Sequence, residues 1–261
     1  MKSLKLLHIS DLHLTPKKKG LLSFIYTWGD LHPDLIISTG DHIAHKDAIS
    51  PLLEALRPLS HVPGFFVFGS NDYFAPTLKN PLRYLFPITS GVARGRKLPT
   101  KILESGLQSL GWKLLHDEIV KIIIKGVRVE LRGTNDAHLG FDSYEKSRGL
   151  RSSSDLNIGV THAPYHRVLE AFTLDGVDLI LAGHTHGGQI RIPWWNGSRA
   201  LTTNCDLPKW RARGFTSVPG QAPLHVSAGL GSSPLHPPRF LNPPSVTLID
   251  IVDLSQGITS L

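Results

Sequence analysis

The sequence predicts an α/β fold in which short buried strands alternate with helical segments. Short apolar runs recur along the chain, and several of them end at a glycine or an acidic residue. Segments with apolar residues at helical spacing lie between these runs, as at residues 47–58, where Leu52, Leu53 and Leu56 share one face. Because this alternation builds a largely parallel sheet, the carboxyl ends of the strands should meet at one edge.

The pattern gives a specific order of elements. We expect strands at residues 4–10, 34–40, 62–68, 112–116, 119–124, 127–132, 156–160, 179–182, 190–193, 224–227 and 245–252. We expect helices after a lysine-rich loop within residues 16–29, over residues 47–58, from Thr100 onward and over residues 166–173. No linker separates these elements, so residues 1–261 are predicted to form a single domain.

Two segments depart from this alternation. Residues 73–99 combine prolines with aromatic and basic side chains, which favours an irregular, lid-like insertion. Residues 16–29 join three lysines to Leu21, Phe24 and Trp28. For this second segment the sequence favours a solvated loop and an amphipathic helix, with a membrane-surface patch as the alternative.

Composition narrows the class of protein. With 41% hydrophobic and 19% charged residues, the chain is ordinary for a globular protein. Its formal charge of +7 favours an anionic partner, such as phosphate, nucleic acid or a lipid head group. The single cysteine, Cys205, excludes an intramolecular disulfide, and with no signal peptide it predicts a cytoplasmic location. No apolar run approaches the roughly 20 residues of a membrane-spanning helix, so no integral membrane protein is expected.

The candidate functional residues lie at the ends of predicted strands. Each offers a carboxylate, amide or imidazole donor, and together these suit zinc, manganese or iron. The seven candidates are Asp11, His13, Asp41, Asn71, His162, His184 and His186. Because the set contains no thiolate, a structural zinc site is not expected.

His184 and His186 are separated by one residue and followed by paired glycines. In an extended segment the two imidazoles would share a side, whereas a glycine-rich turn can splay them. The spacing therefore allows one metal or two adjacent metals, and a tight turn with two solvated histidines is the alternative. Asn135, Asp136 and His138 are expected either to support such a site or to be ordinary loop residues.

The order of these motifs resembles that of the calcineurin-like metallophosphoesterase superfamily. The chain contains D-x-H at Asp11, G-D at Asp41, a glycine-asparagine-aspartate box at residues 69–72, H-x-P at His162 and G-H-x-H at His184. Gly183-His-Thr-His-Gly-Gly-Gln189 is similar to the branch that includes membrane-associated phosphodiesterases and UDP-2,3-diacylglucosamine hydrolases. The resemblance covers nearly the whole chain.

This resemblance implies a two-layer β-sandwich of mixed sheets flanked by helices, with two metal ions at the strand ends. Asp11, His13 and His186 would hold the first ion, His162 and His184 the second, and Asp41 would bridge them. The ions would clamp phosphate oxygens and lower the pKa of a bridging water, whose hydroxide attacks phosphorus in line. The identity of the ions, manganese, iron or zinc, stays open.

One box departs from the family pattern. The family reads G-N-H-[DE], whereas this chain reads Gly69-Ser70-Asn71-Asp72. Either Ser70 replaces the ligand asparagine or, with a one-residue slip, Asn71 recovers that role, and the second reading is favoured because an amide oxygen is the better neutral donor. The histidine that protonates the leaving group is missing, so His42 or His45 is the alternative proton donor.

The sequence therefore predicts a dinuclear-metal phosphoesterase that favours phosphodiester or pyrophosphate-type bonds over monoesters. Asp41, Asn71, His42 and His162 are its predicted catalytic residues, and Arg94, Arg96 and Lys97 in the lid would bind an amphiphilic or nucleotide-lipid substrate. A lid that only excludes water is the alternative for that segment. Peripheral membrane contact is allowed, and no protein partner is implied. Two other classes remain open: a catalytically weak scaffold of the same fold and a metal-dependent nuclease, although no nucleic-acid-binding module is recognisable.

Overall fold

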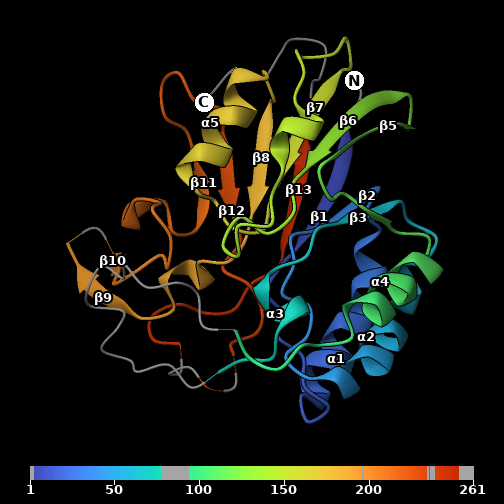
Figure 1. The fold of residues 1–261 in the computed structure, drawn as a ribbon, viewed down its shortest axis with the longest axis vertical. Coiled ribbons are helices and arrows are strands. Elements are labelled where there is room, and N and C mark those ends of the chain that lie inside the picture. Colours follow the sequence, from blue (N-terminus) through green and yellow to red (C-terminus); the bar gives the residue numbers. More distant parts are fainter. Residues whose placement is uncertain (1–2, 78–93, 196, 234, 236–238, 253–261) are drawn as a thin grey trace.

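The computed structural model describes residues 3–77, 94–195, 197–233, 235 and 239–252, and two mixed sheets form its centre (Figure 1). The five-stranded sheet has the order β13-β1-β2-β3-β4, with β1 (Leu4–Ile9), β2 (Leu35–Ser38), β3 (Gly64–Phe66), β4 (Lys113–Leu114) and β13 (Thr247–Ile251). The six-stranded sheet has the order β11-β12-β8-β7-β6-β5, with β5 (Glu118–Ile124), β6 (Val127–Gly133), β7 (Leu156–Val160), β8 (Leu179–Ala182), β11 (Gly214–Thr216) and β12 (Leu224–Val226). The hairpin of β9 (Arg191–Trp194) and β10 (Gly197–Ala200) stands apart from both sheets.

Helices cover the outer faces of the two sheets. The structure contains α1 (Lys19–Tyr26), α2 (Ile49–Leu56), α3 (Ser70–Tyr73), α4 (Thr100–Ser109) and α5 (His166–Leu174). Side chains of α1, α2 and α4 pack with Leu7, Ile36 and Phe66 of the five-stranded sheet. On the six-stranded sheet, Phe172 of α5 belongs to the same buried cluster as Ile180. The layers are therefore helix, sheet, sheet and helix, which confirms the predicted fold class.

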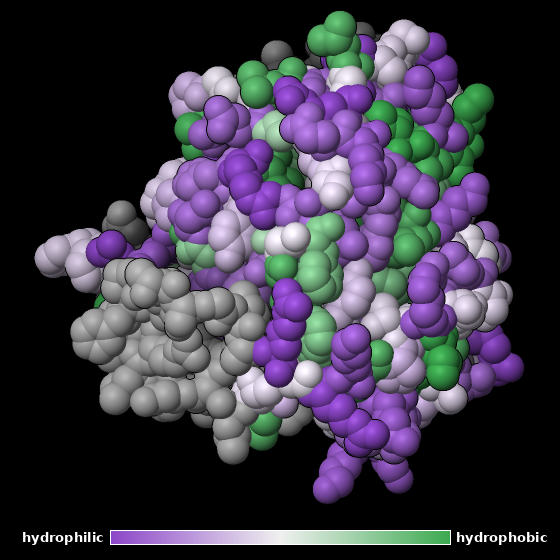
Figure 2. Space-filling view, viewed as in Figure 1, coloured by the Kyte–Doolittle hydropathy of each residue, from purple (hydrophilic) through white to green (hydrophobic). Residues whose placement is uncertain are grey.

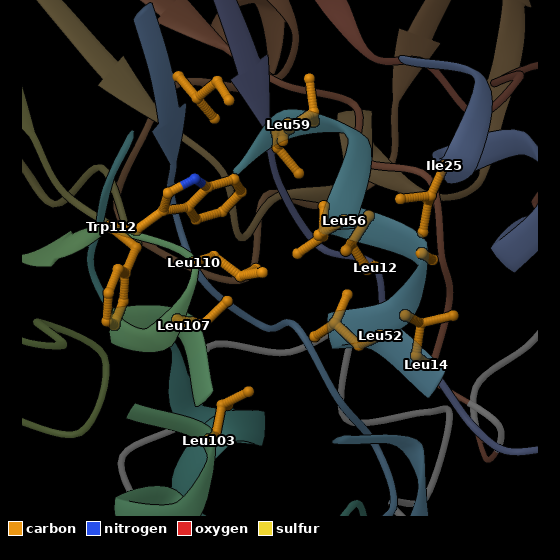
Figure 3. Close-up of a cluster of buried hydrophobic side chains, with 14 of the residues drawn as sticks. Leu12, Leu14, Ile25, Leu52, Leu56, Leu59, Leu103, Leu107, Leu110 and Trp112 are labelled. Atoms are coloured by element: carbon orange, nitrogen blue, oxygen red, sulfur yellow. The ribbon is translucent and has the colours of Figure 1, made fainter. Parts of the chain in front are cut away.

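The core has a separate apolar cluster for each interface between layers. Between the sheets, Leu6 and Ile37 belong to one buried cluster with Val129, Ile158 and Leu181. Under the helices, Leu52, Leu56, Leu103, Leu107 and Trp112 converge (Figure 3). Burying one such side chain stabilises the fold by about 1.5–3 kcal/mol. These side chains are buried, and the coloured part of the face in Figure 2 mixes hydrophilic residues with smaller apolar areas.

Parallel pairing brings the functional loops to one edge. β1, β2 and β3 are parallel neighbours, and so are β6, β7, β8 and β12. The segments that directly follow β1, β2, β3, β7 and β8 contain all seven candidate residues, with Asn71 in α3. As the alternating pattern predicts, the carboxyl ends of the parallel strands lie at one edge of each sheet.

Some elements differ from the sequence prediction in length or were not expected. The strands expected at 62–68 and 112–116 are reduced to β3 and β4. The stretch between the strands expected at 190–193 and 224–227, for which no element was expected, contains β10 and β11. These short strands have partners far from them in the sequence or lie in a hairpin without an apolar run, so periodicity alone did not identify them.

The predicted lid is described only at its two ends, because residues 78–93 lie outside the described residues. The ends lie side by side: Ala75 N–H donates to the Arg96 carbonyl (2.8 Å), and Leu98 N–H donates to the Tyr73 carbonyl (2.8 Å). The excursion thus leaves and returns at one point, directly after the box that contains Asn71. Among the described residues, no helix has both the length and the apolar character needed to cross a membrane.

Candidate metal centre

Strand ends of both sheets deliver four side chains to one place. Asp11, His13, Asp41 and His186 each offer one ligand atom, and these atoms lie within 4.8 Å of one another. Asp11 and His13 follow β1, Asp41 follows β2, and His186 follows β8 in the other sheet. The two sheets therefore meet at a set of carboxylate and imidazole donors that could hold an ion.

The distances within this cluster fit one shared ion. His13 Nε2 lies 3.0 Å from His186 Nε2 and 3.3 Å from Asp41 Oδ2. Asp11 Oδ1 lies 3.5 Å from His186 Nε2. Two nitrogens bound to the same ion at about 2.0–2.1 Å are themselves roughly 3 Å apart. The four side chains therefore need little movement to become ligands of one metal.

The backbone at these donors adopts a conformation that side chains rarely tolerate. The left-handed residues of the site are Asp11 (φ 51°), His13 (φ 41°), Asp41 (φ 55°), His184 (φ 70°) and His186 (φ 49°). Such a conformation costs a non-glycine residue about 1–3 kcal/mol, and it concentrates at functional sites. Hydrogen bonds between the loops hold it, including Asp11 N–H to the Gly40 carbonyl and His13 N–H to the Asp41 carbonyl, both 2.9 Å.

His162 and His184 are oriented by backbone carbonyls. His162 Nδ1 lies 2.7 Å from the Thr39 carbonyl, and His184 Nε2 lies 3.2 Å from the Asn204 carbonyl. Because a carbonyl can only accept, each ring must donate there, so the other ring nitrogen is the one that could bind a metal once it carries no proton. Histidine ligands of metals are commonly held in this way. His162 Nε2 is buried without a hydrogen-bond partner in the structure and lies 3.6 Å from Asp41 Oδ2.

Asn71 contacts the carboxylate predicted to bridge two ions. Its backbone N–H donates to Asp41 Oδ1 (2.7 Å), and its side-chain amide nitrogen donates to Asp41 Oδ2 (2.6 Å). Turning the amide by 180° would place its oxygen at the same point, where it could serve as a ligand. Asn71 therefore lies beside Asp41, as the one-residue slip in the box requires.

Burial and charge set the protonation of the histidines. Burial lowers the pKa of His186 to about 3, and burial together with the charge of His162 lowers that of His184 to about 4. Burial would also lower the pKa of His162, but Asp41 and Asp11 outweigh it and raise that pKa to about 9. At neutral pH and without metal, the His162 ring is therefore protonated at both nitrogens and positively charged, whereas the rings of His184 and His186 are neutral.

Two glycines allow the loops to approach this closely. A Cβ on Gly69 would lie 2.6 Å from the ring of His162 and closer still to Asp41 Oδ1. A Cβ on Gly183 would lie 2.5 Å from Asp11 Oδ2. Real side chains do not fit at such distances, so the glycine of the box and that of the G-H-x-H motif are steric requirements of the site.

His42 has contacts that differ from those expected of a proton donor. Its Nε2 lies 2.8 Å from Ser38 Oγ and its Nδ1 lies 3.0 Å from Asp72 Oδ2. Asp72 also accepts from the backbone N–H groups of Asp41 and Gly69, at 2.8 Å and 3.0 Å. His42 is buried in this network, whereas His45 is half exposed and its ring accepts from Asp47 N–H. The network supports the loop that carries Asp41.

The loop with Asn135, Asp136 and His138 lies against the site. Tyr73 Oη donates to Asn135 Oδ1 (2.7 Å), and the ring of His138 is centred 4.4 Å from that of His184. Burial raises the pKa of Asp136 to about 7, and its Oδ2 has no hydrogen-bond partner in the structure. The three residues are therefore neighbours of the candidate ligands, as one reading of the sequence expected.

Two cationic residues at the site were not identified from the sequence. Lys18 Nζ donates to the His13 carbonyl (3.0 Å) and to the Ser232 carbonyl (3.2 Å). Arg239 Nη2 lies 3.4 Å from His186 Nδ1 and donates to the Gly231 carbonyl (2.6 Å). Lys18 belongs to the lysine run expected to be a solvated loop. These contacts bring the segment that contains Lys18 together with residues 231–239. The sequence pattern did not indicate that either basic residue lies at the candidate metal centre.

The three predicted substrate-binding residues lie at the returning end of the lid. Arg94, Arg96 and Lys97 are exposed. The guanidinium carbon of Arg94 lies 5.6 Å from the ring centre of Phe74 and 5.2 Å from that of Phe141. This cation–π pairing directs Arg94 toward the loop that follows β6.

The thiol of Cys205 is not suited to act as a nucleophile, because burial raises its pKa to about 12.

Comparisons with known proteins agree with this geometry. Residues 4–188 match the family model described as calcineurin-like phosphoesterase. The phosphodiesterase YaeI of Escherichia coli is 27% identical, over 95% of this chain and 82% of its own length. The UDP-2,3-diacylglucosamine pyrophosphatase LpxG of Chlamydia trachomatis is 25% identical, over 94% of this chain and 83% of its own. A 5′-nucleotidase precursor from Thermus thermophilus shares the fold with a TM-score of 0.54 and 13% identity, over 99% of this chain and 53% of its own.

Proposed function

Because the chain belongs to the calcineurin-like phosphoesterase family, we propose that it is a metal-dependent hydrolase of phosphodiester or pyrophosphate-type bonds. The observation that carries this proposal is the convergence of Asp11, His13, Asp41 and His186, whose ligand atoms lie within 4.8 Å of one another. The names of two relatives, a phosphodiesterase and a pyrophosphatase, support the choice of bond.

We assign two divalent ions to the site. Asp11, His13 and His186 would hold the first ion, Asn71, His162 and His184 the second, and Asp41 both. When bound, the ions would polarise the phosphate oxygens and lower the pKa of a coordinated water. Manganese, iron and zinc all suit these oxygen and nitrogen donors, and the choice among them stays a prediction.

The residues of the chain position these groups. Asn71 N–H holds the Asp41 carboxylate from one side, and His13 and His162 flank it. The charges of His162 and His13 outweigh burial and keep the pKa of Asp41 below its usual value, so it is ionised at neutral pH. His42 is proposed as a positioning residue that acts through Asp72, because both of its ring nitrogens are already engaged.

The altered box suggests which leaving groups the enzyme accepts. Residues 69–72 contain no histidine, whereas the family pattern has one, and an amide such as that of Asn71 cannot donate a proton as an acid does. Losing a general acid typically costs about 10² to 10⁴ in rate when the leaving group is poor. We therefore propose a preference for leaving groups that need little protonation, such as the phosphate released from a pyrophosphate-type bond.

The substrate is proposed to be an amphiphilic or nucleotide-lipid phosphate ester. Arg94, Arg96 and Lys97 would contact its head group or leaving group. The relative named UDP-2,3-diacylglucosamine pyrophosphatase supports this choice, because its name describes a nucleotide-lipid substrate. The cytoplasmic location predicted from the single cysteine stays a prediction, and so does peripheral contact with a membrane.

The test begins with metal. Purified protein reconstituted with manganese should bind about two ions per chain and hydrolyse bis-p-nitrophenyl phosphate faster than p-nitrophenyl phosphate. A panel of nucleotide-lipids then identifies the class of substrate. A metal content near zero after reconstitution would leave only the scaffold reading, and cleavage restricted to DNA or RNA would favour the nuclease reading.

A further inference from the structure

We propose that the β9–β10 hairpin and the adjacent turn Lys209–Arg211 form a surface that docks on an anionic lipid bilayer. This hairpin surface consists of Ile192, Trp194, Trp195, Arg199, Lys209 and Trp210. None of these residues is a candidate metal ligand, so bilayer binding requires neither metal nor catalysis. The proposal therefore does not rest on the phosphoesterase activity.

The tryptophans of the chain divide sharply between core and surface. Of the five tryptophans, Trp28 and Trp112 are buried at 1% and 2% exposure. The other three belong to the hairpin surface, where Trp195 is 88% exposed, Trp210 63% and Trp194 46%. An indole ring combines a large apolar face with one polar N–H group, which suits the boundary between lipid and water.

Contacts join these side chains into one surface. β9 and β10 pair with Gly197 opposite Trp194, and Arg199 opposite Ile192. The rings of Trp194 and Trp195 are centred 5.5 Å apart, and the guanidinium carbon of Arg199 lies 5.3 Å from the Trp194 ring centre. The Lys209–Arg211 turn, which contains Trp210, contacts β10.

The charge around this surface selects an anionic partner. Residues 187–246 contain one acidic residue, Asp206, and six lysine or arginine residues, of which Arg191 and Arg211 are buried. Asp206 accepts from His166 N–H (2.9 Å), at the start of α5. Arg199 and Lys209 are exposed beside the tryptophans. Exposed indoles flanked by cations fit a bilayer with anionic head groups, which attracts basic side chains and accepts apolar ones.

The segment at residues 16–29, the alternative membrane patch in the sequence, fits this role less well. Ile25 and Trp28 are buried at 0% and 1% exposure, in the cluster beneath α1 and α2. This segment therefore packs on the protein through Ile25 and Trp28, whereas Phe24 and Tyr26 are 47% and 50% exposed. The hairpin lies on the other side of the molecule from α1, α2 and α4 (Figure 1).

The hairpin is also tied to the metal centre. β9 begins shortly after the turn His186–Gly188, and the Arg191 guanidinium donates to the Gly187 carbonyl (2.8 Å). Phe240, 57% exposed, is bonded to the base of β9 through Arg191 N–H (3.0 Å). A protein docked through the hairpin would therefore be connected to the turn that contains His186 through the base of β9.

The test is sedimentation of the full chain with phosphatidylcholine vesicles, with and without phosphatidylglycerol. Wild-type protein should bind the anionic vesicles, and Trp195→Ser/Trp210→Ser should weaken binding at least about tenfold. Arg199→Glu/Lys209→Glu should also weaken it and reduce its dependence on salt. Quenching of tryptophan fluorescence by lipids brominated in the acyl chain should be lost in Trp195→Ser/Trp210→Ser.

Matched controls use exposed residues elsewhere. Ile102→Ser/Ile123→Ser removes two apolar side chains of 62% and 71% exposure, and Lys101→Glu reverses an exposed charge on α4. These variants, and the metal-site variant Asp41→Ala, should bind vesicles like wild type. Binding that the control pairs weaken equally overturns the proposal, as does no binding to anionic vesicles. Tryptophan-dependent dimerisation or RNA binding without vesicle binding would overturn it too, and would assign the surface to a different partner.

Discussion

The two halves of the candidate metal centre are assembled differently. In the first half, the donors of Asp11, His13, Asp41 and His186 already lie within 4.8 Å of one another. In the proposed second half, which would share Asp41 and add Asn71, His162 and His184, backbone carbonyls orient the two rings and the Asn71 amide faces the Asp41 carboxylate. The first half already has its donor atoms close together at three strand ends, whereas the second adds donors that follow β3, β7 and β8, which backbone carbonyls and Asp41 orient.

The halves also differ in charge. His186 of the first half has its pKa lowered to about 3 by burial, whereas carboxylates raise the pKa of His162 in the second half to about 9. At neutral pH an ion therefore finds a free lone pair on His186 in the first half and must displace a proton in the second. Histidines of one site with similar burial can therefore differ in whether a proton must leave before they bind a metal.

The largest effect is expected at the residue that the halves share. Asp41→Ala should reduce the metal content from about two ions per chain to less than one. It should also lower kcat/KM by at least about 10⁴-fold, because the ions supply several kcal/mol of transition-state stabilisation. Elemental analysis and hydrolysis of bis-p-nitrophenyl phosphate measure both, with the exposed Asp250→Ala as control. Retention of two ions by Asp41→Ala would break the assignment of a shared ligand.

The altered box should produce the next largest effect. Wild-type enzyme should cleave nitrophenyl esters about 10² to 10⁴ times faster than alkyl esters, because the second half lacks the family's proton donor. Asn71→His should narrow that ratio if it keeps its metal, which is measured alongside. His42→Ala and His45→Ala test the other candidate donors. A wild-type enzyme indifferent to the pKa of the leaving group, with both histidine variants equally indifferent, would contradict our interpretation of the box.

A smaller effect is expected from the lid beside the second half. Replacing Arg94, Arg96 and Lys97 with alanine should raise KM for the amphiphilic substrate by about tenfold, through lost charge-assisted hydrogen bonds. KM for bis-p-nitrophenyl phosphate should not change. Lys46→Ala/Lys101→Ala removes exposed lysines elsewhere as a control. Equal losses on both substrates would mean that the lid only excludes water.

The smallest effect separates the halves by their protons. Since the pKa of His162 is raised to about 9 in the metal-free fold, metal loading at pH 7 should release about one proton, and affinity at the second half should rise with pH up to about 9. The stabilisation that protonated His162 gives the metal-free fold is complete below its unfolded pKa and is lost as pH rises through about 9.

Calorimetry of manganese binding in buffers of different ionisation enthalpy counts these protons. The variant His162→Gln should bind its remaining ion without that release, because His184 and His186 are neutral at pH 7. Proton release that persists in His162→Gln would place the titrating group elsewhere and remove the contrast between the halves.

Much of the fold and the site could be predicted because the signals are local. Each of the seven candidates follows an apolar run, as His184 follows β8. The ability of a residue to bind a metal depends on its own side-chain donor atoms, which the sequence shows directly. The positions of β10, β11, Lys18 and Arg239 were missed for the opposite reason. Lys18 meets Ser232 across most of the chain, and no periodicity encodes such a contact.

His42 shows the limit most clearly. The sequence places it next to Asp41, which made it a reasonable proton donor. In the structure its ring contacts Ser38 and Asp72 instead. The left-handed backbone at Asp41 sets the direction of the next side chain, and the sequence does not show that backbone conformation.

The sequence by itself determined the alternation of strands and helices, the set of donors and the family they resemble. Only the tertiary structure decided which donors come together, since His186 of one sheet meets His13 of the other across 173 residues of chain. It also decided which tryptophans are buried in the core and which face solvent on the hairpin. The physical reason is that ligand chemistry and periodicity reside in single residues and short segments, whereas distance, burial and pKa depend on neighbours that only packing brings together.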